Sequence, residues 1–127
     1  MKITMIPTLL AGAAMLMIAV QARAELVEIR FNEQGRFEHS ATVAAGKFVE
    51  ICSKLTKGQA LPWTFKSDQP MQFNIHYHED KKVEFPAKLQ SATSAEARLE
   101  VPIDQHYCWM WANKGSTDAQ LTFSVQK

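Results

Sequence analysis

The residues best suited to chemistry are two histidines separated by one residue, His76 and His78, at the end of the segment Met71–His78. This segment alternates apolar and polar residues, and side chains two apart on an extended strand project from the same face. Two neighbouring imidazoles are typical ligands of copper or zinc, and the carboxylate of Glu79 would add an oxygen ligand. The alternative is a solvated strand face that happens to carry two histidines. The spacing alone leaves both interpretations open.

A metal site at this pair needs a further ligand. The candidates in the sequence are His39, His106, Met110 and a reduced Cys108. Copper is favoured over zinc if the thioether of Met110 takes part, although packing is the favoured role for this residue. A blue-copper site is disfavoured, because it needs a histidine shortly after the cysteine and none follows His106.

Three tryptophans, Trp63, Trp109 and Trp111, lie at alternating positions of extended segments. Each indole removes a large apolar area from water when buried, so the favoured interpretation places them in the core. If they faced outward, Trp109 and Trp111 would instead form an aromatic surface for binding a ligand.

Motifs of hydrolytic enzymes are absent from the sequence. It has neither a G-x-S-x-G nucleophile elbow nor an H-E-x-x-H metal helix. A cysteine held in a disulfide is not a nucleophile, and a small β-domain offers little concave surface. We therefore expect a protein that is not an enzyme.

The first 24 residues have the features of a cleaved export signal. Lys2 supplies a positive start, Leu9–Val20 is an apolar run, and Ala22-Arg23-Ala24 fits the small-x-small cleavage rule. The apolar run is shorter than the roughly 20 residues that span a bilayer. Residues 25–127 contain no second apolar run long enough to cross a membrane. We expect a periplasmic or secreted protein without a transmembrane segment in residues 25–127.

Composition predicts one folded domain over residues 25–127. The whole chain of 127 residues carries 14 basic and 13 acidic side chains, a net charge of +1. This balance argues against a polybasic binder of nucleic acid or of anionic membranes. The hydrophobic fraction of 46% is enough for a core, and the length is too small for two ordinary domains.

Cys52 and Cys108 are the only cysteines in the chain. An even number of cysteines in an oxidising compartment favours a disulfide. Closing the long loop between them would stabilise the fold by roughly 4 kcal/mol in the chain-entropy model. A catalytic or metal-binding thiol is the alternative role.

Period-2 alternation predicts an antiparallel β-sandwich of about eight strands. Turn residues recur roughly every 8–12 positions after Glu25. Residues 90–99 would also suit a short helix because of their alanine, glutamate and arginine content. The expected strands cover residues 26–31, 36–43, 47–55, 60–66, 71–78, 83–89, 95–101, 107–113 and 119–126.

Several of these motifs follow one another in a distinctive order. They are Ala45-Gly46-Lys47, Leu61-x-Trp63-x-Phe65, Met71-x-Phe73-x-Ile75, Tyr107-x-Trp109-x-Trp111-x-Asn113 and Leu121-x-Phe123-x-Val125. Over about residues 44–127 this order resembles a GOLD domain, the β-sandwich of eukaryotic Golgi cargo receptors and of some lipid-transfer proteins. The resemblance implies a GOLD-like or jelly-roll sandwich that acts as a binding module.

The chain also departs from that family. The second cysteine of the cargo receptors aligns with Met110, two residues after Cys108, which is a shift that keeps the same strand face. The coiled coil, membrane helix and cytoplasmic tail that cargo sorting requires are missing from this sequence. Cargo-receptor function is therefore not transferred with the fold.

The sequence thus predicts an exported, non-enzymatic binding or interaction module of the bacterial envelope. We expect a monomer or weak oligomer whose partner is an envelope protein or a small ligand. The alternative function is a periplasmic copper or zinc binding protein that uses His76 and His78.

Overall fold

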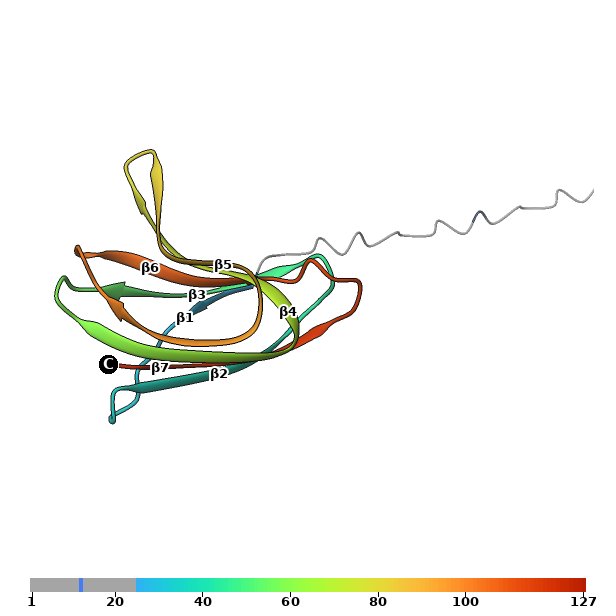
Figure 1. The fold of residues 1–127 in the computed structure, drawn as a ribbon, viewed down its shortest axis with the longest axis horizontal. Coiled ribbons are helices and arrows are strands. Elements are labelled where there is room, and N and C mark those ends of the chain that lie inside the picture. Colours follow the sequence, from blue (N-terminus) through green and yellow to red (C-terminus); the bar gives the residue numbers. More distant parts are fainter. Residues whose placement is uncertain (1–11, 13–24) are drawn as a thin grey trace, which may run out of the picture.

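The computed structural model describes residue 12 and residues 25–127, and the second of these ranges folds into strands joined by turns (Figure 1). The expected export signal lies outside the described residues, apart from Gly12. The strands are β1 (Glu25–Glu28), β2 (Arg36–Val43), β3 (Phe48–Leu55), β4 (Ala60–Glu79), β5 (Lys82–Glu100), β6 (Gln105–Ala112) and β7 (Ala119–Gln126). In this part of the chain, no helix is long and apolar enough to cross a bilayer.

All seven strands of the described residues belong to one curled sheet, which confirms the all-β prediction. The strand order is β1-β3-β6-β4-β7-β2, and β5 pairs with β4 outside this path. Every pairing is antiparallel except that of β1 with β3, which is parallel and corrects the expectation of a wholly antiparallel sheet. The parallel pair arises because β2 lies at the far end of the sheet and the chain then returns to place β3 beside β1.

The long strand β4 folds the sheet into two facing layers (Figure 1). Its first half, Trp63–Ser67, pairs with β7, and its second half, Gln72–His76, pairs with β6. The layer of β1, β3 and β6 therefore continues through β4 into the layer of β7 and β2.

Two expected strand breaks are absent from the described residues, so the chain has fewer strands than predicted. Residues 67–70 remain extended within β4, although the register with β5 shifts between Lys66 and Met71. Asp68 Oδ1 accepts a hydrogen bond of 2.8 Å from the backbone N–H of Gln120, which supports a bend there instead of a reversal. Residues 90–99 continue β5 as a strand, because pairing with β4 outweighs their helix propensity.

The core fills the space between the two layers. Alternating side chains of β3, β4, β6 and β7 point inward, as the period-2 pattern predicts. The largest fully buried members are Trp109, Trp111, Tyr107, Phe65, Phe73, Ile51, Leu61, Met71, Ile75, Leu121, Val49 and Val125. Because odd-numbered residues of β4 and β6 face this core, the even-numbered residues between them face outward.

Candidate functional site

The outer face of β3, β6 and β4 carries one row of chemically active side chains. Cys52 on β3 lies opposite Cys108 on β6, and Cys108 lies opposite His76 on β4. Their chain neighbours Trp109 and Ile75 are buried in the core. Alternation therefore brings the two cysteines and a histidine together on the side of the sheet that faces away from the core.

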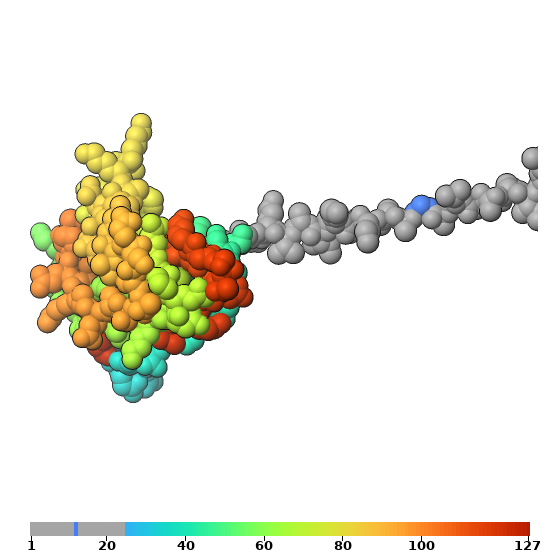
Figure 2. Space-filling model, turned by 45° about the vertical axis from the view of Figure 1, so that its right-hand side comes forward, coloured from blue at the N-terminus to red at the C-terminus, as the bar shows by residue number. Residues whose placement is uncertain are grey.

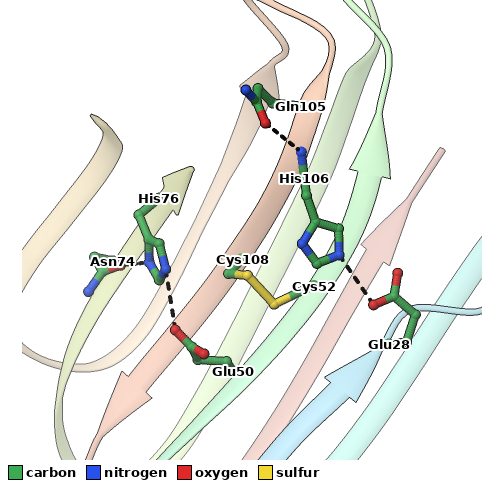
Figure 3. Close-up of a disulfide and its surroundings, with 8 residues drawn as sticks. All are labelled: Glu28, Glu50, Cys52, Asn74, His76, Gln105, His106 and Cys108. Atoms are coloured by element: carbon green, nitrogen blue, oxygen red, sulfur yellow. Dashed lines mark hydrogen bonds and ion pairs between the residues drawn. A yellow bond between two sulfur atoms is a disulfide. The ribbon is translucent and has the colours of Figure 1, made fainter. Parts of the chain in front are cut away.

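The two cysteines form a disulfide with a sulfur–sulfur distance of 2.12 Å, which confirms the predicted bridge. Cys52 has no exposed surface and Cys108 is buried. The bond lies between two histidine–carboxylate pairs, one on each side (Figure 3).

The first pair is His76 with Glu50. His76 Nε2 lies 3.2 Å from Glu50 Oε1, and His76 Nδ1 lies 2.7 Å from Asn74 Oδ1. The side chain of His76 is only 8% exposed. Burial lowers the pKa of His76, the negative charge of Glu50 opposes this effect, and His78 adds to it. The ring is thus a buried base held in place through both of its nitrogens.

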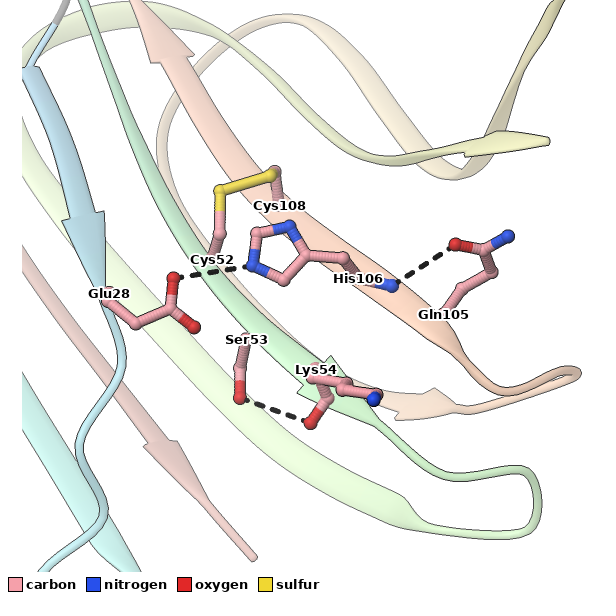
Figure 4. Close-up of polar contacts among 7 residues, drawn as sticks. All are labelled: Glu28, Cys52, Ser53, Lys54, Gln105, His106 and Cys108. Atoms are coloured by element: carbon pink, nitrogen blue, oxygen red, sulfur yellow. Dashed lines mark hydrogen bonds and ion pairs between the residues drawn. A yellow bond between two sulfur atoms is a disulfide. The ribbon is translucent and has the colours of Figure 1, made fainter. Parts of the chain in front are cut away.

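The second pair is His106 with Glu28. His106 Nε2 lies 3.3 Å from Glu28 Oε2, and both side chains are about half exposed. The other ring nitrogen of His106 faces the disulfide (Figure 4). This pair is therefore the more exposed of the two beside the disulfide.

Two sets of potential metal ligands meet at Cys108. The first set consists of Cys52, His106 and Cys108, and the second set consists of Glu50, His76 and Cys108. Within each set, one donor atom from each residue lies within 4.8 Å of the other two. The arrangement combines sulfur, imidazole and carboxylate groups, but the two sulfurs are bonded to each other, and cysteine binds zinc or copper as a thiolate.

The histidines predicted from the sequence lie side by side. The ring centroids of His76 and His78 are 5.5 Å apart, edge to face, and both rings are on the outer face. Met110 shares this face and lies opposite Glu50 on β3. Glu79 follows His78 in the strand, so alternation directs it to the opposite side. Metal binding by this set stays a prediction.

The structure adds residues that the sequence pattern did not single out. Glu50 and Glu28 reach the disulfide because the pairing of Cys52 with Cys108 fixes the register of β3 against β6, and β1 lies beside β3. If Cys52 and Cys108 are assumed to face each other across two paired strands, alternation places Glu50, two residues before Cys52, on the same strand face as the disulfide. His39, by contrast, lies on β2 and belongs to neither ligand set.

The suggested aromatic surface of Trp109 and Trp111 is wrong. Neither side chain has exposed surface. Both contact Phe123 of the facing layer, with ring centroids 5.7 and 4.9 Å away respectively. The odd-numbered face of β6 points into the core, so both indoles pack there, as the favoured interpretation predicted.

A second surface feature is the β4–β5 arm, which we define as residues 77–89. It projects from the body of the molecule (Figure 2). The large apolar side chains Val83, Phe85 and Leu89 on its β5 strand are 41%, 45% and 38% exposed. Among residues 25–127, β5 pairs only with β4, so its outer edge is open.

Comparison of the fold with solved structures finds β-rich domains, among them periplasmic proteins. The PliG protein of Aeromonas hydrophila, a periplasmic inhibitor of g-type lysozyme, has a TM-score of 0.62 at 10% identity over 82% of this chain and 96% of that one. The corresponding inhibitor from Salmonella Typhimurium has a TM-score of 0.56 at 10% identity, covering 82% and 98%.

The pre-peptidase C-terminal domain of Bacillus anthracis collagenase has a TM-score of 0.59 at 11% identity, covering 84% of this chain and 97% of that one. No protein-family model and no curated protein sequence matches the chain. At these identities the likeness establishes a shared sandwich-like fold.

Proposed function

We propose that residues 25–127 form an exported, non-enzymatic module that binds a protein partner through the β4–β5 arm. The observation that carries this proposal is the exposure of three large apolar side chains on one open strand. Folded proteins rarely leave apolar side chains grouped on a long free edge, because such an edge promotes aggregation. A partner that covers the arm would explain why these apolar side chains are exposed in the isolated protein.

The details of the arm favour contact through side chains over the unlimited addition of further strands. Pro86 lacks a backbone N–H and therefore interrupts the hydrogen-bonding edge of β5. The ammonium group of Lys88 lies 4.7 Å from the ring centroid of Phe85, which leaves part of that ring accessible. Apolar anchors surrounded by charged side chains are typical of protein interfaces.

The fold neighbours support the same class of function. The PliG proteins are periplasmic and act on another protein as inhibitors of g-type lysozyme. The disulfide of this chain suits an oxidising compartment outside the cytoplasm. The GOLD resemblance, which the solved structures leave untested, also implies a binding module.

A g-type lysozyme is the first partner to test. The affinity of purified residues 25–127 for this enzyme is measured by calorimetry, and the inhibition of cell-wall lysis is measured in parallel. We expect Phe85→Glu to weaken binding by more than about tenfold, since a central aromatic anchor commonly contributes over 2 kcal/mol. The matched control is Leu26→Glu, because Leu26 is an exposed apolar residue on β1, at the opposite edge of the sheet.

A wider test covers partners other than lysozyme. A photo-crosslinking residue is placed at position 85 or at position 26, and the exported protein is irradiated in cells. The proposal expects one defined protein adduct from position 85 and none from position 26. Equal adducts from both positions, or lysozyme binding that Phe85→Glu leaves unchanged, would overturn the assignment of the arm as the binding surface.

A further inference from the structure

We propose that the Cys52–Cys108 disulfide is a reversible attachment site for a small aminothiol, a molecule that carries an ammonium group two carbons from its thiol. In the product the external sulfur is bonded to Cys108, and Cys52 is a free thiol. The site does not rest on the function proposed for the arm.

The two cysteines differ in their access to solvent. Cys52 has no exposed surface, whereas Cys108 is 8% exposed. The rate of thiol–disulfide exchange depends on which sulfur the incoming thiolate can reach. In the folded protein an external thiol therefore attacks Cys108, and the small exposed area suits a small molecule better than the thiol of a folded protein.

The two sulfurs also have different neighbours. Cys108 on β6 lies between Cys52 on β3 and His76 on β4 (Figure 3). A carboxylate oxygen of Glu50 lies within 4.8 Å of the Cys108 sulfur, in the group that includes His76. A ring nitrogen of His106 lies within 4.8 Å of both sulfurs. The attacked sulfur therefore has a carboxylate beside it, and the sulfur that leaves has an imidazole beside it.

His106 stabilises the sulfur that leaves. Its Nε2 lies 3.3 Å from Glu28 Oε2, and the other ring nitrogen faces the disulfide (Figure 4). A protonated imidazole donates from both of its nitrogens. In this form the ring donates one N–H to Glu28 and transfers the other proton to the departing Cys52 thiolate, which is the role of a general acid.

The exchange needs no oxidant or reductant besides the aminothiol. Its thiolate forms a bond to Cys108 Sγ, and the bond between Cys52 and Cys108 breaks. The electron pair of that bond leaves with Cys52 Sγ, which takes the proton from His106. The ring regains a proton from the solvent, which received one when the external thiol ionised. The external sulfur is thus oxidised to a disulfide sulfur while Cys52 is reduced.

Glu50 accounts for the preference for a positively charged thiol. Its side chain is 25% exposed, so a small molecule at Cys108 can contact the carboxylate. An ammonium group two carbons from a sulfur bonded to Cys108 reaches this carboxylate, because the oxygen and Cys108 Sγ lie within 4.8 Å of each other. A thiol that carries a carboxylate at the same place is repelled.

The strand ladder makes the attachment reversible. The facing pairs on either side of the cysteines are Ile51 with Trp109 and Ser53 with Tyr107, and these four residues are buried. This pairing keeps the Cys52 thiol opposite the mixed disulfide. Cys52 therefore displaces the aminothiol and restores the bridge when the concentration of free aminothiol falls.

The first experiment locates the adduct. Oxidised residues 25–127 are mixed with excess cysteamine without denaturant, quenched with acid at early times and analysed by peptide mass spectrometry. We expect one cysteamine per chain, on Cys108. In urea above the unfolding midpoint, both cysteines should be modified at comparable rates. An equal distribution over the two cysteines in the folded protein, or no adduct until the chain unfolds, would overturn the proposal.

Single-cysteine variants test the difference in access directly. Cys52→Ser leaves the thiol of Cys108, and Cys108→Ser leaves the buried thiol of Cys52. With cystamine, the disulfide of cysteamine, the Cys108 thiol should be modified at least about tenfold faster, because exchange follows access to the sulfur. Circular dichroism checks that both variants keep the β-fold. Equal rates in two folded variants would contradict attack at Cys108.

A pair of thiols of opposite charge tests the role of Glu50. Exchange rates with cysteamine and with mercaptopropionate are each divided by the thiolate concentration, and we expect cysteamine to react faster. Glu50→Gln should lower the ratio of the two rates by about threefold, as for a partly exposed ion pair. Glu38→Gln is the matched control, because Glu38 lies on β2 in the other layer. Wild-type rates that are independent of thiol charge would overturn the assignment to an aminothiol.

Histidine variants test the proton donor. His106→Gln should slow the exchange by about tenfold or more, because it removes the general acid beside the leaving sulfur. It should also lower the ultraviolet absorbance of the thiolate in the reduced protein, since a protonated imidazole stabilises a neighbouring thiolate. His78→Gln is the control, because His78 belongs to neither group of donor atoms. An equal effect of both variants on the exchange rate would contradict the role of His106.

Discussion

Cys52 and Cys108 face each other directly across the β3–β6 ladder, and their disulfide joins residues 56 apart in the sequence. Backbone pairing also joins the two strands along their full length, from Phe48 opposite Ala112 to Leu55 opposite Gln105. The bond therefore acts mainly on the unfolded chain, where it closes a long loop.

Removing the bridge should lower stability without changing the fold. We expect Cys52→Ala with Cys108→Ala to lose up to about 4 kcal/mol of unfolding free energy, as the chain-entropy model gives for a loop of this length. Urea denaturation of the double variant and of the oxidised wild type measures the difference. An unchanged midpoint would mean that the unfolded chain is not restricted by the bond.

Asn113 should contribute more to stability than its polar type suggests. It is fully buried, its Nδ2 donates to Val43 O at 2.9 Å and to Thr117 O at 2.8 Å, and its Oδ1 accepts from Gly115 N at 2.9 Å. Asn113→Ala leaves several backbone groups without partners, so we expect a loss of about 2–4 kcal/mol in urea denaturation.

Asn32 provides the control for Asn113. Its Oδ1 also accepts two backbone hydrogen bonds, from Gln34 and Arg36, but these lie at the surface. Water replaces them in Asn32→Ala, so the loss should be about 1 kcal/mol or less. Equal losses in the two variants would contradict the role assigned to burial.

The sequence predicted the strand faces more accurately than the strand ends. Alternation correctly assigned Phe73 and Ile75 to the core and His76 to the outer face, because residues two apart share a side. It failed at Ser67-Asp68-Gln69-Pro70, where turn-forming residues produce only a bend. The side chains of Gln69 and Asp68 bond to Thr117 before β7 and to Gln120 near the start of β7, contacts that local propensity does not contain.

The candidate site was predicted in part. His76 and the cysteine pair were identified, but their convergence required the order of β3, β6 and β4 in the sheet. Glu50 and Glu28 were missed because carboxylates on exposed strand positions are common. Only the register across three neighbouring pairings distinguishes these two from the other acidic residues.

The tryptophans give a direct optical test of the core. Trp109 and Trp111 have no exposed surface and Trp63 is buried. The folded protein should therefore show blue-shifted emission that acrylamide quenches poorly, with a red shift on unfolding in urea. We expect Trp111→Ala to lower the free energy of unfolding by about 3–5 kcal/mol, the usual effect of removing a large buried aromatic ring. Emission of the folded state like that of free tryptophan would contradict this packing.

Hydrogen exchange should distinguish the two sides of β4. Strand β6 lies between β3 and β4 and is largely buried, so its amides should exchange only through global unfolding. Strand β5 pairs on one side only, and its outward amides should exchange orders of magnitude faster, especially in the arm around Phe85. Mass spectrometry of peptic fragments from the isolated protein measures both. If the amides of β5 are as protected as those of β6 at low protein concentration, the outer edge of β5 is already covered in the isolated protein. If protection of β5 appears only when a partner is added, the interface lies on the arm.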